Sequence, residues 1–258
     1  MSRKPSIGVF KFASCDGCQL SLLDLEDELV ALTGAVDIAF FPEMSSNMRK
    51  GPYDIALVEG SVTTHHDAGR IQQIRKQAKT LVAIGACSTA GGIQALRNWN
   101  DSKKWVNQVY AHPEYIQTLS MSTPISGHVA VDFELRGCPV NKHQLLELVS
   151  ATLAGRKPNI PTYSVCVECK RRGNVCVAVA RGLACLGPAT QAGCGAICPS
   201  FARGCYGCFG PAESTNTAVL ADHLLASGRD PDEVLRAFRS FNAWSWPNRQ
   251  ATQGKGLV

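Results

Sequence analysis

The sequence predicts an α/β fold in which a doubly wound parallel sheet is followed by a small irregular domain with helices at its C-terminal end. The first half of the chain alternates short apolar runs, typical of strands, with amphipathic stretches of helical period. From residue 157 onward this alternation stops, and cysteine and glycine become frequent. We therefore expect a first domain at 1–158 and a second at 159–258.

Five apolar runs account for the predicted strands. They cover residues 7–12, 36–41, 54–58, 81–84 and 129–135. Apolar residues at helical spacing predict the helices between and after these strands, namely Leu22, Leu25, Leu29 and Leu32, then Ile71, Ile74 and Ala78, then Leu145, Val149 and Leu153. Alternation of this kind is typical of a parallel sheet that is covered by helices.

The second half of the chain has no regular pattern of apolar residues over most of its length. Pro158 and Pro161 interrupt any regular pattern, and up to about residue 211 there is little periodicity from which a normal core could be built. Helical patterns return near 218–226 and again after Pro231. We expect the irregular part to be held together by bound groups more than by apolar packing.

Composition excludes several classes of protein. The chain has 258 residues, 45% of them hydrophobic, and a net charge of +5, which is too mild to indicate a nucleic-acid or membrane-surface protein. No run approaches the ~20 apolar residues that a membrane helix needs. Residues 1–14 reach the first cysteine without an apolar stretch of the kind found in export signals, so we expect a cytoplasmic protein.

The chain contains twelve cysteines, which need an explanation other than packing. Six disulfides are a poor explanation in a reducing compartment, so metal binding is favoured. Four of the cysteines follow predicted strands: Cys15 and Cys18 the first, Cys87 the fourth and Cys138 the fifth, while Glu59 follows the third. Because ligands of an open parallel sheet gather beyond the carboxyl ends of its strands, we expect these sulfurs to surround one point.

Thiolates in such a crevice favour an iron-sulfur cluster, and the surrounding glycines fit this interpretation. Gly17, Gly85 and Gly137 stand beside the cysteines and would let the backbone approach a bulky inorganic core. A nucleotide site at 85–92 is disfavoured because the segment lacks both the phosphate-loop ending and the dinucleotide spacing. A single buried cysteine would be interpreted as a small apolar residue, but four together indicate ligands.

The remaining eight cysteines separate by spacing into two groups of four. These are Cys166, Cys169, Cys176 and Cys185, then Cys194, Cys198, Cys205 and Cys208. Two further four-thiolate clusters use all of them, so that no cysteine is left over. Zinc is an alternative for these two groups, because Cys-x-x-Cys pairs are also common zinc ligands.

Basic residues outnumber acidic ones around the later cysteines. Glu168 is the single acid near five cations, Lys170, Arg171, Arg172, Arg181 and Arg203. Stacking aromatic residues do not alternate with these cations as nucleic-acid binding would require, so we interpret them as neutralising thiolate-rich clusters or as meeting a protein partner. We therefore expect no nucleic-acid ligand.

Taken in order, these motifs resemble the small subunit of nickel-iron hydrogenases over essentially the whole chain. The first part of the resemblance consists of Cys15-Asp-Gly-Cys18, the segment 58–61, Gly85-Ala-Cys87 and Gly137-Cys138-Pro139. The second part consists of Cys185-Leu-Gly-Pro188 followed by Cys194, and of Cys205-Tyr-Gly-Cys208. Spacing from 165 to 208 is most similar to the cytosolic NAD(P)-linked group, which includes the sulfhydrogenase delta subunits.

The resemblance implies a flavodoxin-like first domain and three [4Fe-4S] clusters. It implies a proximal cluster on Cys15, Cys18, Cys87 and Cys138, a distal cluster on Cys166, Cys169, Cys176 and Cys185, and a medial cluster on Cys194, Cys198, Cys205 and Cys208. Exported members of the family use a histidine at the distal cluster, where this chain has Cys166. Many of them have a three-iron medial centre, to which Cys198 would add a fourth ligand here. All three clusters are therefore expected to contain four irons.

The resemblance also implies the function and the partners of the chain. Electrons would pass between a large subunit that holds the nickel-iron site and further iron-sulfur and flavin/NAD(P)-binding subunits. No residue here is expected to be catalytic. The chain lacks the pair of Cys-x-x-Cys motifs, one near each terminus and one with a nearby His, that hold nickel and iron in the large subunit. Glu59 is expected to tune the proximal cluster or to fix the interface, with a capping or solvated acid as the alternative.

Two other functions stay open at this point. One is the cluster-bearing subunit of a quinone oxidoreductase, which shares the first domain but usually carries adjacent cysteines and lacks the eight later ones. The other is a zinc-stapled binding protein. Metal content would separate the zinc protein from the other two.

Overall fold

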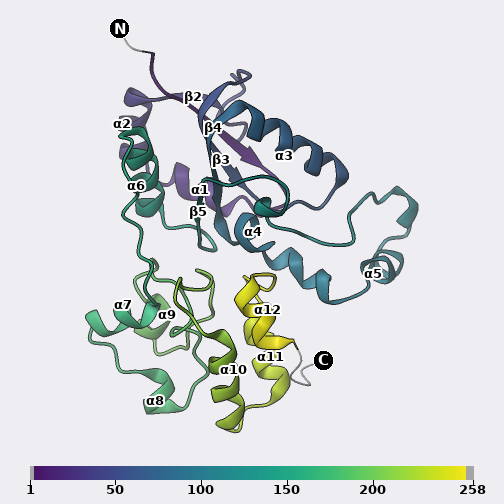
Figure 1. Ribbon diagram of the computed structural model, residues 1–258, viewed down its shortest axis with the longest axis vertical. Helices are drawn as coiled ribbons and strands as arrows, with labels where there is room; N and C mark the ends of the chain where they lie inside the picture. The colour runs from purple at the N-terminus through teal and green to yellow at the C-terminus, as the bar shows by residue number, and fades with distance from the viewer. Residues whose placement is uncertain (1–2, 254–258) are drawn as a thin grey trace.

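The first domain is a five-stranded parallel sheet. In the computed structural model, which describes residues 3–253, the strand order is β2-β1-β3-β4-β5 (Figure 1). The strands are β1 Ser6–Lys11, β2 Asp37–Phe40, β3 Tyr53–Glu59, β4 Ala78–Ile84 and β5 Phe133–Leu135. Every neighbouring pair runs parallel, and the order is that of flavodoxin, so the predicted doubly wound sheet is confirmed.

Helices cover both faces of this sheet. They are α1 Gly17–Leu23, α2 Asp27–Ala35 and α6 Lys142–Leu153 on one face and α3 His65–Gln77 on the other. Strand β3 shows the alternation that makes this possible, because Ile55 and Leu57 pack with Leu145 of α6, whereas Val58 packs with Ile71 of α3. The sheet is therefore buried between two apolar layers.

Two predicted elements differ from the structure. The helical pattern from Leu22 to Leu32 is divided into α1 and α2, because Glu26 adopts a positive φ of 51° between them. The last strand begins at Phe133 instead of 129, since the side chain of Asp132 accepts a hydrogen bond from the Leu81 N–H where the ladder would otherwise continue. Neither difference moves the carboxyl ends of the strands, where the first group of cysteines is predicted to lie.

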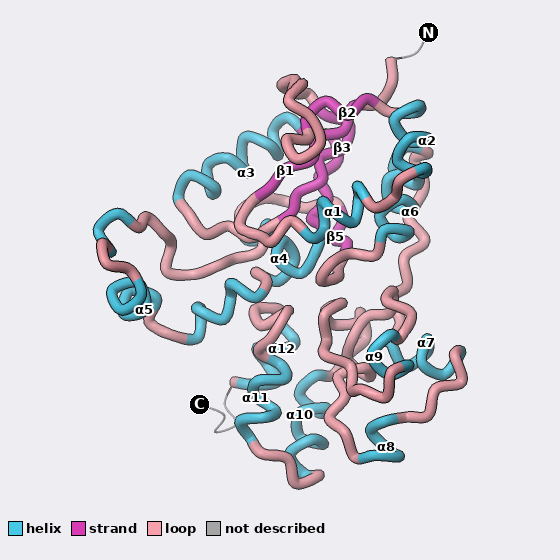
Figure 2. Tube along the Cα trace, turned by 180° about the vertical axis from the view of Figure 1, so that it is seen from behind, coloured by secondary structure: helices cyan, strands magenta, loops and turns pink. Residues whose placement is uncertain are grey.

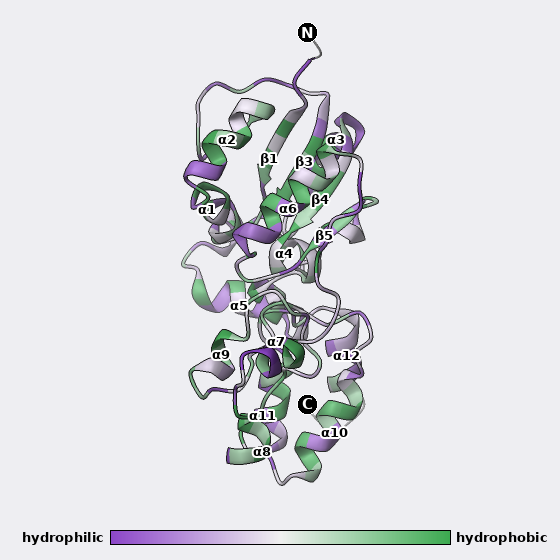
Figure 3. Ribbon diagram, turned by 90° about the vertical axis from the view of Figure 1, so that its left-hand side faces the viewer, coloured by the Kyte–Doolittle hydropathy of each residue, from purple (hydrophilic) through white to green (hydrophobic). Residues whose placement is uncertain are grey.

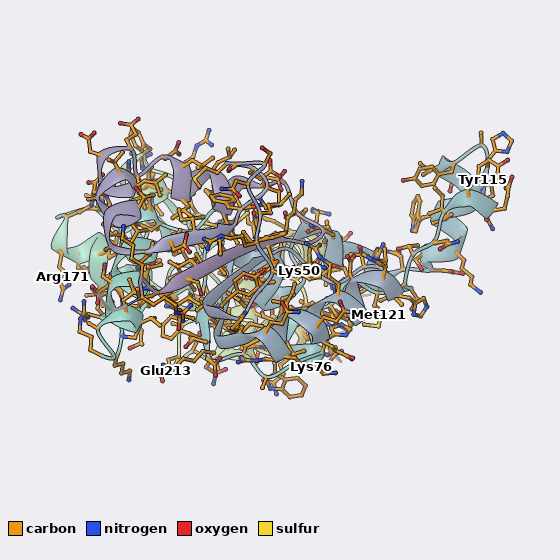
Figure 4. The ribbon with its side chains drawn as sticks, turned by 90° about the horizontal axis from the view of Figure 1, so that it is seen from above. Lys50, Lys76, Tyr115, Met121, Arg171 and Glu213 are labelled. Atoms are coloured by element: carbon orange, nitrogen blue, oxygen red, sulfur yellow. The ribbon has the colours of Figure 1, made fainter. Side chains whose placement is uncertain are left out.

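A long arm separates β4 from β5. It contains α4 Gly85–Ala90, the 3-10 turns η1 Ile93–Trp99, η2 Pro113–Tyr115 and η3 Ile125–Gly127, and helix α5 Ser102–Val109. The base of the arm is held by hydrogen bonds from Arg97 to Thr118 and from Asn98 to Ser122. Its tip, marked by Tyr115, projects well away from the body of the molecule (Figure 4).

The second domain begins after α6 and consists mostly of loops (Figure 2). Short helices α7 Val165–Arg171, α8 Val177–Arg181 and α9 Ile197–Ser200 interrupt these loops. They are followed by α10 Thr217–Ala226, α11 Pro231–Phe238 and α12 Trp246–Thr252, the last of which was not predicted. Leu186, Leu224, Val234 and Phe238 form a small core between the loops and these helices.

Side-chain contacts join the two regions. The Arg239 guanidinium lies 3.6 Å from the centre of the Trp99 ring, and Trp99 meets Trp244 edge to face. Arg136 donates to the Pro211 carbonyl, and Asn141 donates to Gly193 O at 2.9 Å. None of the helices within residues 3–253 has the length and apolar character that crossing a membrane requires.

Candidate iron-sulfur sites

All twelve cysteines have free thiols, so none of the sulfur is used in disulfides. The first group lies at the carboxyl edge of the sheet, as predicted. Cys15 follows β1, Cys18 is in α1, Cys87 is in α4 and Cys138 follows β5. Helix α4 begins directly where β4 ends, and α1 begins after a short loop that follows β1, so both helices start at this edge of the sheet.

The pKa values of three of these four thiols are raised. Burial is the main cause that raises the pKa of Cys18, and it also raises the pKa of Cys87 to about 11. The pKa of Cys138 is raised by burial and then by Cys15. Neighbouring thiols in this group therefore add to the rise in pKa that burial causes at Cys18, Cys87 and Cys138. Iron binding would offset this cost, because a metal stabilises the thiolate.

Two glycines leave space beside the sulfurs of this group. A Cβ on Gly85 would lie 2.4 Å from Cys18 Sγ, and a Cβ on Gly92 would lie 2.6 Å from Cys87 Sγ. Both residues also have positive φ, 88° and 66°, which L side chains rarely adopt. The predicted role of Gly85 is thus confirmed as a close approach of backbone to sulfur.

Glu59 is the last residue of β3 and is only 2% exposed. Its Oε1 accepts a hydrogen bond of 3.0 Å from the Cys18 N–H, and Oε2 has no partner within residues 3–253. Burial is the main cause that raises the pKa of this carboxyl. The alternative of a solvated acid is wrong, because the side chain fixes the first turn of α1 from inside the protein.

Gln94 also belongs to this site and was not predicted. Its Nε2 donates to Ala13 O at 2.7 Å, and its Oε1 lies 3.6 Å from Cys87 Sγ. The amide therefore ties the loop after β1 to the helix that carries Cys87. Nothing in the sequence marks Gln94 except its place just after the Gly91-Gly92 pair.

The second group surrounds a cavity of about 50 Å³, whose lining includes Cys166, Cys169, Cys176 and Cys185. Helix α7 carries the first two one turn apart, and Cys176 precedes α8. A Cβ on Gly187 would lie 3.3 Å from Cys185 Sγ and 3.6 Å from Cys166 Sγ. Only glycine therefore leaves the space between these two sulfurs open. Burial, followed by the charge of Cys185, raises the pKa of Cys166.

The third group comprises Cys194, Cys198, Cys205 and Cys208. Burial raises the pKa of both Cys205 and Cys208 to about 12, and the charges of the neighbouring cysteines add to the effect at Cys208. The Gly207 N–H points at Cys205 Sγ from 3.5 Å, as backbone amides do around thiolates. These donors also form one group.

Hydrogen bonds link the segment of the third group to the segments of the other two. The Cys205 N–H donates to Cys185 Sγ at 3.2 Å, which joins the third group to the second. Asn141, three residues after Cys138, donates to the carbonyl of Gly193 next to Cys194 at 2.9 Å, which links the third group to the first. The segment of the third group therefore contacts the segments of both other groups, although it comes last in the sequence.

Two further polar residues hold the third group in place. Glu168 of α7 accepts hydrogen bonds from the Gly193 and Ala196 N–H groups, which fixes the loop around Cys194. Asn242, only 2% exposed, donates to the carbonyls of Gly207 and Cys208. Neither role was predicted, because each depends on segments that meet only in the folded chain.

The donor chemistry fits iron-sulfur clusters. Eleven of the twelve thiols are buried or half-buried and Cys15 is exposed. Glycines leave space beside sulfurs of the first two groups, and the Gly207 N–H points at a sulfur of the third. Across residues 3–253, no three His, Cys, Asp or Glu side chains are arranged so that they could hold a single metal ion between them.

Comparison with known proteins identifies the family. Residues 15–152, more than half of the chain, match the family described as NADH ubiquinone oxidoreductase, 20 Kd subunit. Sulfhydrogenase 2 subunit delta of Pyrococcus furiosus is 34% identical, and the match covers 92% of this chain and 99% of that protein. The chain belongs to the small-subunit family of nickel-iron hydrogenases. The predicted resemblance is confirmed.

Other members of the hydrogenase small-subunit family agree with this assignment. The F420-non-reducing hydrogenase of Methanocaldococcus jannaschii has a vhu subunit that is 32% identical, with 88% of this chain and 91% of that protein covered. A solved NAD+-reducing [NiFe]-hydrogenase chain superposes with a TM-score of 0.58 at 31% identity, covering 62% of this chain and 96% of the other. The chain is thus an oxidoreductase subunit of a family that binds iron-sulfur clusters and transfers electrons.

Proposed function

We propose that this hydrogenase small subunit relays electrons through three [4Fe-4S] clusters between a nickel-iron site on a large subunit and a flavin/NAD(P) module. The domain at 1–158 would hold the proximal cluster, and the domain at 159–258 the medial and distal clusters. Each bound cluster would supply one-electron oxidation and reduction. The chain itself would perform no bond-making step.

One observation carries this proposal: all twelve cysteines are free, and hydrogen bonds link the segments that bear neighbouring groups of them. Proximal ligands would be Cys15, Cys18, Cys87 and Cys138, medial ligands Cys194, Cys198, Cys205 and Cys208, and distal ligands Cys166, Cys169, Cys176 and Cys185. The Cys205–Cys185 hydrogen bond and the Asn141–Gly193 hydrogen bond support the order proximal, medial, distal.

The polar residues of the chain would hold these sites in fixed geometry. Glu59 would fix Cys18 through its backbone N–H and keep a carboxyl group next to the proximal cluster. Gln94 would orient Cys87, and Glu168 would hold the medial loop against the helix of the distal site. Rigid ligands of this kind keep the sites at constant spacing while electrons pass.

The partners follow from the same order of sites. A large subunit with the nickel-iron site would cover the edge that carries the proximal group, and further iron-sulfur and flavin/NAD(P)-binding subunits would meet the distal end. The NAD-reducing hydrogenase HoxS subunit delta of Cupriavidus necator, 24% identical over 62% of this chain, supports such a module. We propose a cytoplasmic location for the complex.

Metal analysis of the anaerobically purified complex tests the proposal. We expect about twelve iron and about twelve sulfide per small subunit, with a brown sample. Colourless protein that contains about three zinc ions would overturn the proposal in favour of a zinc-stapled protein.

A single cysteine substitution tests the relay itself. In the Cys194→Ser and Cys205→Ser variants, iron is expected to fall by about a third, and hydrogen-dependent reduction of the final acceptor should be lost while the first domain stays folded. Acceptor reduction at the wild-type rate would contradict a relay through the medial site.

A second candidate function is the cluster-bearing subunit of a quinone oxidoreductase. The family match over 15–152 favours it for the first domain, but the hydrogenase relatives extend over the eight later cysteines as well. Copurification decides between the two. A nickel-containing large subunit in the native complex supports the hydrogenase, whereas quinone reduction by a nickel-free complex supports the alternative.

A further inference from the structure

A groove adjoins the candidate distal site on its outer side. Its volume is about 270 Å³, and it is lined by Gly173, Asn174, Val175, Val177, Arg181, Pro199, Ser200 and Ala202. Val177 and Pro199 also line the cavity of the distal cysteines, so the two spaces are separated by single side chains. Hydrogen bonds from Arg172 and Asn174 to Ser200 Oγ hold the two walls of the groove together.

Apolar side chains stand exposed around this groove. Val175 is 71% exposed, Val179 is 87% exposed and Phe201 is 76% exposed. Figure 3 shows α8, which carries Val179, as a mainly hydrophobic helix at the outer end of the second domain. Apolar groups in this position gain free energy only when another surface covers them.

The segment that forms the groove is mainly basic. Between residues 165 and 206 there are five basic residues, Lys170, Arg171, Arg172, Arg181 and Arg203, and a single acidic one. That acid, Glu168, is turned inward to the Gly193 and Ala196 amides, so its charge is already engaged. Arg171 marks the outer edge of this region, on the opposite side of the molecule from Tyr115 (Figure 4).

We propose that this distal surface, formed by Lys170, Val175, Val179, Arg181, Phe201 and Arg203, docks an acidic protein that accepts electrons. The inference rests on the proposed function and specifies the partner that would be seated at the distal end. Cations around an apolar centre match a partner with carboxylates around an apolar patch. Two exposed valines and a single exposed aromatic, Phe201, among these cations favour a protein over a single-stranded nucleic acid, which would need several aromatic side chains on which successive bases stack.

Lys170 supplies the test, because its amine can be joined to a carboxylate by a zero-length carbodiimide cross-link. The purified complex is mixed with an acidic [4Fe-4S] ferredoxin as the probe, cross-linked and digested. We expect Lys170 to be joined to carboxylates of the ferredoxin, or of an acidic subunit already seated at this surface.

Charge reversal supplies the comparison. In the Arg181→Glu/Arg203→Glu variant we expect at least a tenfold loss of the Lys170 product, with a smaller loss at about 0.2 M salt. The Lys76→Glu/Lys79→Glu variant changes the charge equally at exposed positions of the first domain and should keep wild-type cross-linking. Val179→Asp should also lower the yield, because it places a charge on the apolar centre.

The outcomes separate this inference from the proposed function. Iron content and hydrogen-dependent reduction of benzyl viologen should stay at wild-type values in all three variants, since a small dye needs no docking surface. A complex without iron or viologen activity would contradict the relay. With both intact, an unreacted Lys170, an equal yield in the charge-reversed variant, or displacement of the probe by nucleic acid would show that the docking proposal is wrong.

Discussion

Gly85 is the residue at which backbone and sulfur approach most closely in the candidate proximal site. Its φ of 88° already disfavours other residues, and an added Cβ would lie 2.4 Å from Cys18 Sγ. We therefore predict that Gly85→Ala displaces Cys18 and prevents assembly of the proximal cluster. Iron should fall by about a third, measured by metal analysis of the purified complex.

Gly155 provides the matched control for this substitution. It has a similar positive φ of 66°, but a Cβ there would meet nothing within 4 Å. Gly155→Ala should therefore cost about 1 kcal/mol of folding free energy from backbone strain and leave iron unchanged. Equal iron in both variants would mean that the space beside Cys18 is not needed.

Glu147 controls the exit of the chain from α6. Its carboxylate accepts two hydrogen bonds from Arg156 and one from the Asn159 N–H. The hydrogen bond from Arg156 is the main cause that lowers the pKa of Glu147 from 4.5 to about 2. The ionised carboxylate therefore stabilises the folded protein fully above pH 4.5, and this contribution is lost as the pH falls through 2. Glu147→Gln should unfold at lower urea than wild type at neutral pH, with a difference that shrinks only below pH 4.5.

A control separates this ion pair from the general effect of losing a negative charge. Glu213 is exposed at the surface (Figure 4), so Glu213→Gln should leave the urea midpoint nearly unchanged at every pH. If the difference in urea midpoint between wild type and Glu147→Gln grew as the pH was lowered, the prediction would be wrong, because a lowered pKa requires that difference to shrink.

For single residues, the sequence predicted the candidate ligands and Glu59 but missed the other residues that hold the cysteine segments in place. Cysteine is rare and chemically distinct, so its count and spacing already indicated the donor groups. Glu59 could be found because it ends a strand at the ligand edge of the sheet. Gln94, Glu168 and Asn242 could not, because an amide or carboxylate has no signature until the fold brings its partner within hydrogen-bond distance.

Among the elements, strands were predicted better than the segments between them. The apolar runs of β1, β3 and β4 are buried on both faces, which leaves a signal independent of the rest of the chain. The break at Glu26 was missed since leucine spacing continues across it. Helix α12 was missed because its sequence, WPNRQAT, has too few apolar positions to show a period.

The C-terminal segment around Asn242 acts as a support for the loop that carries Cys205 and Cys208. Asn242 Nδ2 donates to two carbonyls of that loop, and removing it leaves both without this donor. We predict that Asn242→Ala lowers the free energy of unfolding by about 1–3 kcal/mol and loosens this loop first. Hydrogen exchange over 205–210, followed by mass spectrometry, measures the change.

Two variants make this prediction specific. Asn242→Asp keeps the size of the side chain but directs oxygens at the same carbonyls, so it should destabilise the protein at least as much as Asn242→Ala. Asn47→Ala removes an exposed asparagine and should leave exchange over 205–210 unchanged. Protection of the loop at wild-type levels in the Asn242 variants would show that it is held by other contacts.

Across the whole molecule, the two domains meet at an aromatic contact between Trp99 at the base of the arm and Arg239 with Trp244 in the second domain. We predict that Trp99→Ala weakens this contact by about 1–3 kcal/mol while each domain keeps its own fold and iron. Faster hydrogen exchange confined to 96–100 and 239–246 would show this.

Trp105 provides the control for Trp99, because it lies half exposed in α5 on the arm. Trp105→Ala should change neither exchange at the domain contact nor iron content. Global unfolding of Trp99→Ala, with loss of all iron, would mean that the two domains fold only as one unit.

The projecting arm has a practical consequence for handling the protein. Trp105, Val109, Tyr110 and Tyr115 are between 49% and 76% exposed on a segment that has little core of its own. Apolar groups presented in this way promote self-association when the chain is concentrated alone. We expect the isolated subunit to precipitate readily and to stay dispersed when it is produced together with the rest of its complex.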